Sequence, residues 1–83
     1  MKIEYSKAAI KIISALDKRT QIRMKQAIEA IPRGDIKPLK GTASFYRLRV
    51  GDWRIVFRYL SDDTIFIEKI APRGDVYKGG LLH

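Results

Sequence analysis

The chain has 83 residues with 46% hydrophobic side chains and no cysteine, which predicts one domain over residues 1–83 and excludes disulfides and thiolate metal sites. The N-terminus lacks the apolar run of a signal peptide, and no segment approaches the roughly 20 apolar residues of a membrane span, so we expect a soluble cytoplasmic domain. A net charge of +8 and a pI near 10.1 indicate an anionic partner, usually nucleic acid, unless the charge is only a solvated basic surface.

The predicted elements begin with Met1–Tyr5, a short alternating segment that we expect to form a strand. Ser6 is a candidate helix N-cap, and two apolar stripes at helical spacing follow it. The stripes consist of Ala9, Ile12, Ile13 and Leu16, then Ile22, Ala27, Ile28 and Ile31. We interpret them as an αα-hairpin that Pro32 and Gly34 end, with a loop over Pro32–Thr42.

The rest of the chain predicts three strands, at Phe45–Val50, Trp53–Leu60 and Thr64–Ala71. Short turns at Gly51-Asp52 and at Ser61–Asp63 separate them, so consecutive strands run antiparallel. The predicted order is β-α-α-β-β-β. This is an α+β fold in which a two-helix hairpin packs on one face of an antiparallel sheet.

A two-residue loop at Gly51-Asp52 determines which residues of the central hairpin share a face. Arg49 then lies opposite Arg54, and Arg47 lies opposite Val56. One face is wholly apolar and belongs under the helices, and it holds Tyr46, Leu48, Val50, Trp53, Ile55 and Phe57. The opposite face holds Phe45, Arg47, Arg49, Arg54, Val56 and Arg58.

Four arginines on one face repel one another, on the order of 0.2–1 kcal/mol for each directly opposed pair. Between Phe45 and Arg58 the only acidic residue is Asp52, in the turn. The planar guanidinium suits bidentate contacts to phosphate, so we interpret this face as an anion site. A charged edge that discourages aggregation between sheets is the structural alternative.

A second candidate cluster follows the last predicted strand, in Ile70–Tyr77. Pro72 and Gly74 constrain the loop around Arg73, and Tyr77 adds an aromatic ring. Taken alone, each residue is better explained structurally, Arg73 as an exposed loop arginine and Tyr77 as a tyrosine that caps the core. Beside a basic face, the two become candidates for phosphate binding and for base stacking on single-stranded RNA.

Two sequence blocks, Phe45–Phe57 and Ile70–Tyr77, resemble the RelE/ParE toxin superfamily, and specifically its RelE branch. Leu39–Gly41 and the helical segment ending at Ala27–Ile31 are similar to the same family, so the resemblance covers nearly the whole chain. The first block is shared with relatives that are not nucleases, while the Arg-x-x-Val-Tyr motif is more typical of RelE-like members.

The resemblance implies a toxin of a bacterial or archaeal toxin–antitoxin pair, which enters the A site of the 30S ribosomal subunit and cleaves mRNA. In such toxins the 2′-OH attacks the adjacent phosphorus, with no metal and no other cofactor. The resemblance also implies a RelB-like antitoxin as protein partner, and contact with operator DNA only through the toxin–antitoxin complex. It implies no membrane partner.

Matched motif to motif, the catalytic positions of the family fall on Arg47, Arg49, Arg54, Arg73 and Tyr77. The first two are lysines in RelE itself, and because an arginine stays protonated, Arg49 is not expected to act as a general base. We expect the three strand arginines to stabilise charge on the scissile phosphate, with Arg73 assisting the leaving oxygen and Tyr77 stacking on the nucleotide. The proton acceptor is unassigned. Further RNA contacts are expected at Lys40, Phe45, Arg58 and Lys78.

The histidine and the glutamates of the chain are weaker candidates for a catalytic role. Relatives of the YoeB type use a C-terminal histidine, but the residues before His83 do not match those relatives. Glu4, Glu29 and Glu68 lie on different elements and form no paired-carboxylate or metal constellation, and we expect Glu68 to be an ion-pair partner.

Two alternative functions stay open: a ParE-like inhibitor of DNA gyrase, and an inactive relative that serves only as an antitoxin-bound repressor.

Overall fold

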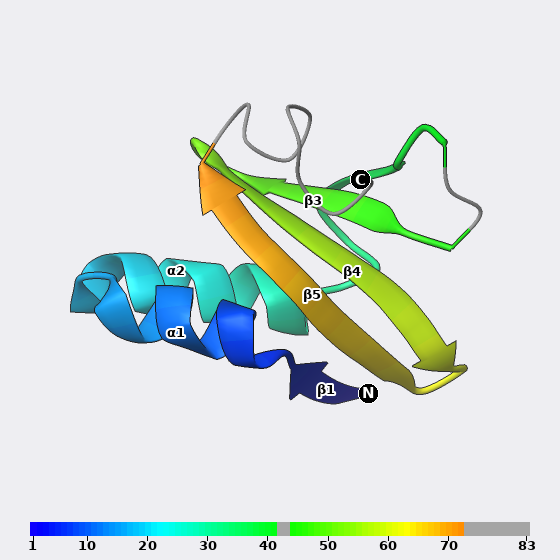
Figure 1. The fold of residues 1–83 in the computed structure, drawn as a ribbon, viewed down its shortest axis with the longest axis horizontal. Helices are drawn as coiled ribbons and strands as arrows, with labels where there is room; N and C mark the ends of the chain where they lie inside the picture. Colours follow the sequence, from blue (N-terminus) through cyan, green and yellow to red (C-terminus); the bar gives the residue numbers. More distant parts are fainter. Residues whose placement is uncertain (42–43, 73–83) are drawn as a thin grey trace.

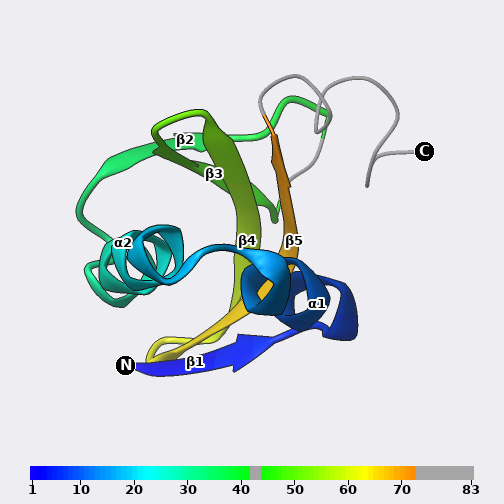
Figure 2. The same ribbon diagram turned by 90° about the vertical axis from the view of Figure 1, so that its left-hand side faces the viewer.

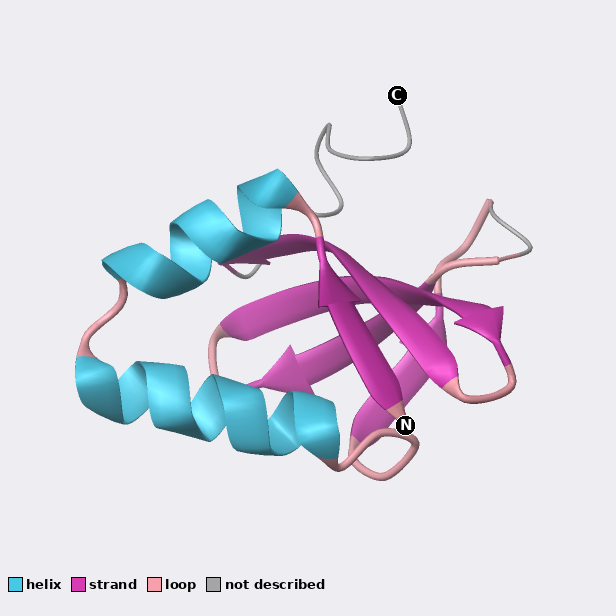
Figure 3. Cartoon of the chain, turned by 90° about the horizontal axis from the view of Figure 1, so that it is seen from below, coloured by secondary structure: helices cyan, strands magenta, loops and turns pink. Residues whose placement is uncertain are grey.

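The computed structural model describes residues 1–41 and 44–72, which form two helices and one five-stranded sheet (Figure 1; Figure 3). In chain order the elements are β1 (Lys2–Tyr5), α1 (Lys7–Ala15), α2 (Lys18–Glu29), β2 (Asp35–Pro38), β3 (Tyr46–Val50), β4 (Trp53–Ser61) and β5 (Thr64–Pro72). The sheet order is β1-β5-β4-β3-β2, so β4 is central and β1 and β2 are the edges. The α+β class and the two-helix layer on one face of the sheet are confirmed.

The sheet differs from the prediction in two respects. Asp35–Pro38 lies within the segment that the sequence predicts as loop, yet it pairs with β3 as an antiparallel edge strand. Strand β1 pairs with β5 in parallel, so the sheet is mixed and not antiparallel throughout. The length of a turn predicts only how the two strands that it joins pair, so it does not predict the partner of β1. Strand β2 has four residues and ends in Pro38, which is too short an alternating pattern to be recognised as a strand in the sequence. An edge is where a strand proline is tolerated.

Each helix begins at a polar N-cap. The Ser6 hydroxyl accepts a hydrogen bond from the backbone N–H of Ala9 at 3.0 Å and donates one to the carbonyl of Glu68 at 2.7 Å. The carboxylate of Asp17 accepts from the backbone N–H of Thr20 at 3.1 Å. Ser6 is thus confirmed as a cap, and it also ties the start of α1 to β5.

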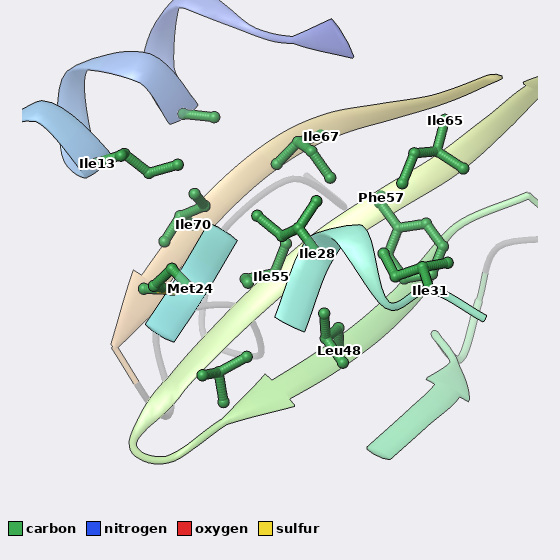
Figure 4. Close-up of a cluster of buried hydrophobic side chains, with 12 residues drawn as sticks. Ile13, Met24, Ile28, Ile31, Leu48, Ile55, Phe57, Ile65, Ile67 and Ile70 are labelled. Atoms are coloured by element: carbon green, nitrogen blue, oxygen red, sulfur yellow. The ribbon is translucent and has the colours of Figure 1, made fainter. Parts of the chain in front are cut away.

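The main core lies between the helices and the inner face of the sheet. Helix α1 packs chiefly on β5 and α2 packs on β3 (Figure 2). Figure 4 shows Ile13 of α1 and Met24 and Ile28 of α2 gathered with apolar side chains of the sheet. The predicted inner face is confirmed, because all six of its residues are buried or half-buried in this cluster.

A smaller apolar cluster covers part of the outer face, away from the helices. Leu39, Val56 and Ala71 are buried there, and Phe45 packs against them. The segment that joins β2 to β3 therefore contacts the same face as the strand arginines.

Within the described residues, neither helix has the length and apolar character needed to cross a lipid bilayer.

Candidate functional site

The central hairpin has the register that its two-residue loop predicts. Arg49 lies opposite Arg54, and Arg47 lies opposite Val56. Gly51, the first loop residue, has a φ of 59°, which glycine adopts without steric cost and which a type II′ hairpin turn requires. Because side chains alternate along a strand, Arg47, Arg49, Arg54 and Arg58 share the outer side of the sheet. We refer to these four residues as the arginine face.

The four arginines differ in their exposure. Arg47 and Arg54 are buried, at 9% and 6% relative exposure, whereas Arg49 is exposed and Arg58 is half-buried. The outer apolar cluster explains part of this burial, since Val56 and Ala71 lie directly across the strands from Arg47 and Arg54, respectively. The arginine face is therefore a partly covered site and not a uniformly solvated surface.

Acidic residues of the neighbouring strands offset part of its charge. Arg47 Nη1 lies 3.5 Å from Asp35 Oδ1, and Arg58 Nε donates to Glu68 Oε1 at 2.9 Å. Both carboxylates come from outside the hairpin, in which Asp52 is the only acidic residue. The prediction that Glu68 is an ion-pair partner is confirmed. Arg58 is thus held in place by a carboxylate before any ligand binds.

Among the described residues, two buried guanidinium nitrogens have no hydrogen-bond partner: Nη1 of Arg47 and Nε of Arg54. Arg47 Nη1 is within ion-pair distance of Asp35 but outside hydrogen-bond geometry, and Arg54 Nη1 makes only a long bond of 3.4 Å to the carbonyl of Trp53. A buried donor left unpaired costs about 1–3 kcal/mol, and more when it is charged. A bound anion would supply the missing acceptors, and arginine's planar fork suits a phosphate.

The other predicted site residues fall into two groups. Lys40 is exposed in the segment after β2, and Phe45 is half-buried in the outer apolar cluster. Arg73, Tyr77, Lys78 and His83 lie outside the described residues. The structure therefore brings together the strand arginines and Phe45, and the contribution of the C-terminal motif stays a prediction.

Asp35 is the site residue that sequence reasoning missed. It lies opposite Arg49 in the β2–β3 register and forms its ion pair with Arg47. The available signal was weak: Asp35, Ile36 and Lys37 alternate in polarity directly after Gly34, but over too few residues to predict a strand.

Among the described residues, three side chains have a clearly shifted pKa. Burial, with a contribution from Glu29, raises the pKa of Tyr5. Hydrogen bonds from Thr20 lower the pKa of Asp17, and those from Ser61 and Thr64 lower the pKa of Asp63. No group of three or more potential metal ligands occurs in residues 1–41 and 44–72.

Comparison with known proteins places these features in a family. Residues 3–77 match the family described as the ParE toxin of the type II toxin–antitoxin system parDE. The chain is 36% identical to RelE1 of Methanocaldococcus jannaschii, over 92% of this chain and 93% of that protein. It is 29% identical to toxin RelE3 of the same organism, over 93% of this chain and 96% of the relative.

Solved structures give the same result for the fold. The chain is similar to the archaeal RelE–RelB complex from Pyrococcus horikoshii, with a TM-score of 0.69 and 28% identity over 89% of this chain and 96% of that one. It is also similar to the RelB–RelE antitoxin–toxin complex from Methanococcus jannaschii, with a TM-score of 0.70 and 26% identity over 90% and 95% of the two chains. The chain therefore belongs to the RelE/ParE superfamily, as a RelE-like toxin of a type II toxin–antitoxin system.

Proposed function

We propose that this toxin is a metal-independent endoribonuclease that cleaves mRNA in the ribosomal A site and so stops translation. The observation that carries the proposal is the pair of buried arginines, Arg47 and Arg54, whose guanidinium groups retain unpaired donors. Arg49 lies opposite Arg54 and is exposed, so it adds a third cation at the border with solvent. Three fixed cations on adjacent strands suit one phosphodiester group.

The proposed reaction needs charge stabilisation more than redox or metal chemistry. The 2′-oxygen bonds to the adjacent phosphorus and the bond from phosphorus to the 5′-oxygen breaks, which leaves a 2′,3′-cyclic phosphate and a 5′-OH. Negative charge grows on the non-bridging oxygens, and Arg47, Arg49 and Arg54 are the groups proposed to stabilise it. An arginine stays protonated at neutral pH, so none of the three is assigned the proton of the 2′-OH.

The C-terminal motif completes the proposal. Arg73 would assist the leaving 5′-oxygen, and Tyr77 would stack on the nucleotide. Lys40, Phe45, Arg58 and Lys78 would contact flanking RNA. Because Arg58 already pairs with Glu68, its contribution to RNA binding should be smaller than that of Arg49.

A RelB-like antitoxin is the proposed protein partner, because the solved relatives were crystallised as RelE–RelB complexes. An acidic antitoxin segment would suit the net charge of +8. We propose that the free toxin acts on the 30S subunit in the cytoplasm, and that it reaches operator DNA only as part of the antitoxin complex.

Cell-free translation with primer extension on the mRNA tests the proposal. The wild-type chain should produce cuts at A-site codons, and Arg54→Ala should lower the cleavage rate at least 10-fold. Arg73→Ala should also lower it, and unchanged cleavage would remove Arg73 from the mechanism. Lys25→Gln, which removes one exposed positive charge from α2, is the matched control and should cleave like the wild type. Intact mRNA with the wild-type chain would contradict the nuclease assignment.

A ParE-like inhibitor of DNA gyrase is the second candidate, because the matching family model carries the ParE description. Such a toxin would act by binding and would need no phosphodiester chemistry. Blocked supercoiling by gyrase together with intact mRNA would favour it. Normal growth of cells that express the chain without antitoxin would point to the third possibility, an inactive repressor subunit.

A further inference from the structure

Arg58 of β4 is held by two neighbours from β5. Its Nε donates to Glu68 Oε1 at 2.9 Å, and its guanidinium carbon lies over the ring of Phe66, 5.3 Å from the ring centroid. Phe66 lies directly opposite Arg58 in the register of β4 and β5, two strands that Figure 1 shows side by side. The guanidinium is therefore fixed by a carboxylate at one edge and by an aromatic ring on one side.

Part of this arginine remains open to solvent. The Arg58 side chain is 37% exposed, whereas that of Glu68 is 20% exposed. Phe66 is half-buried under the guanidinium. A planar group that stays accessible while its orientation is fixed can stack on a second flat ring, and it loses little conformational entropy when it does so.

The carboxylates around Arg58 disfavour a phosphate as its ligand. Glu68 already offsets the positive charge of the guanidinium. Phe66 alternates with two core residues of β5 and so lies on the outer side of the sheet, and exposed Glu4 of β1 lies opposite it on that side. A phosphate at Arg58 would meet repulsion from these carboxylates, whereas an uncharged nucleobase would not.

Arg58 is also close to the proposed phosphate site. Arg47 lies opposite Val56, and Arg58 is two residues further along β4 on the same side of the sheet. Diagonal neighbours of this kind lie about 7–8 Å apart, which long side chains can span. An RNA with a phosphate bound at Arg47 would therefore place an adjoining nucleotide near Arg58.

We propose that the guanidinium of Arg58, backed by Phe66 and held by Glu68, is a stacking surface for one nucleobase beside the scissile phosphate. Proteins that bind single-stranded RNA stack bases on arginine planes as well as on aromatic rings. This deepens the proposed function and rests on it, because it assigns a base contact to one residue of the arginine face. Arg47, Arg49 and Arg54 then bind phosphate, and Arg58 binds a base.

The test removes the base and the arginine separately and together. The probes are ribosomes programmed with an mRNA whose A-site codon carries 2′-O-methyl groups, with every base present or with one base removed at a time in this codon and its two neighbours. For the wild-type chain, removal of the stacked base should weaken binding about 5-fold, the lower end of the range for one stacked base. Arg58→Gln should weaken binding to the intact mRNA by a similar factor, and removal of that base should then have no further effect.

Salt dependence distinguishes a base contact from a phosphate contact. Arg58→Gln should leave the slope of log affinity against log salt unchanged, whereas loss of one phosphate contact on a single strand lowers it by about 0.7. Arg58→Lys keeps a positive charge beside Glu68 but lacks the planar group, so it should lose the effect of the base as Arg58→Gln does. A loss shared by both variants therefore does not arise from an unpaired Glu68.

The matched control is Lys69→Gln. Lys69 is half-buried, lies opposite Val56 on the outer side of the sheet and carries a charge without a planar group. Lys69→Gln should leave the effect of the base as large as in the wild type. An effect of the base that persists in Arg58→Gln would overturn the stacking site, as would unchanged binding by that variant or a slope lowered by about 0.7. Wild-type binding that is insensitive to removal of every base tested would also overturn it.

Failure of the stacking site and failure of the nuclease proposal give different results. If the wild-type chain cuts mRNA in the primer-extension assay and the effect of the base persists in Arg58→Gln, only the stacking site fails. If the wild-type chain leaves mRNA intact but binds programmed ribosomes with an effect of the base that depends on Arg58, the nuclease proposal fails and the stacking site stands. Absence of binding to programmed ribosomes would overturn both.

Discussion

Arg47 of β3 forms an ion pair with Asp35 of the edge strand β2, with 3.5 Å between Nη1 and Oδ1. The two partners differ in exposure, since 11% of the Arg47 side chain but 48% of the Asp35 side chain is accessible. The arginine is therefore fixed within the sheet while the carboxylate remains solvated. Under the proposed function, we expect an incoming phosphate to displace Asp35 from Arg47.

Asp35→Asn should strengthen RNA binding about 2- to 5-fold, because it removes the carboxylate that competes with phosphate for Arg47. Its effect on stability should stay within about 1 kcal/mol, as expected for a half-exposed pair. Filter binding on uncleavable RNA and urea denaturation measure the two effects. Asp52→Asn removes the same charge from the hairpin turn and serves as the control. Weaker RNA binding by Asp35→Asn would show that Asp35 positions Arg47 instead of competing for it.

Replacing Arg54 by methionine separates a binding role from a structural one. Methionine keeps the apolar bulk and removes a buried guanidinium whose Nε is unpaired, so Arg54→Met should leave stability unchanged or raise it by up to about 2 kcal/mol. Cleavage and RNA binding should fall at least 10-fold. Denaturant unfolding and primer extension report the two quantities.

Arg58→Met is the contrasting variant, since it leaves Glu68 without its partner. It should lower stability while retaining more of the RNA affinity than Arg54→Met. A marked destabilisation by Arg54→Met, with RNA binding intact, would make Arg54 a structural residue.

Ser6 connects a helix start to the sheet, and Ser6→Ala should remove both hydrogen bonds of its hydroxyl. The loss should be about 1–2 kcal/mol, which for a domain of this size lowers the melting temperature by several degrees. Ser6→Thr keeps the hydroxyl and should recover most of the stability. Ser14→Ala, on the exposed side of the same helix, should change stability little. An equal effect of Ser6→Ala and Ser14→Ala would contradict the capping role.

Local signals were sufficient for most of the fold. Ser6 and the apolar spacing indicated both helices, although Ile22 of the second stripe is exposed and Met24 is buried in its place. Gly51-Asp52 specified the register of β3 and β4, because a short loop leaves few ways to pair its flanking strands. The pairing of β1 and β2 with the rest of the sheet could not be predicted from such local signals. The partners of β1 and β2 depend on where the chain returns after the helices, and Asp35–Pro38 carries little pattern of its own.

The candidate site, too, was predictable only where local sequence pattern determines it. Alternation along the strands placed Arg47, Arg49 and Arg54 on one face, as the structure has them. Their burial and their acidic neighbours depend on elements distant in sequence, so the range of exposure, from buried Arg54 to exposed Arg49, was not predicted.

The last prediction concerns acid stability. Hydrogen bonds lower the pKa of Asp17 and Asp63 below the usual value of 3.8. A carboxyl group whose pKa is lower in the folded than in the unfolded state contributes stability above pH 3.8, and this contribution is lost as the pH falls through the lowered folded value. The melting temperature should therefore decline below about pH 4.

The double variant Asp17→Asn/Asp63→Asn should flatten this decline. At position 17 the single amide oxygen of asparagine can still accept the backbone N–H of Thr20, and at position 63 it can accept the hydrogen bonds of the turn. Neither asparagine titrates. Circular dichroism melts between about pH 2 and pH 7 measure the effect. Asp62→Asn removes a neighbouring exposed carboxylate from the same turn and is the control. A decline as steep in the double variant as in the wild type would show that other carboxylates govern acid unfolding.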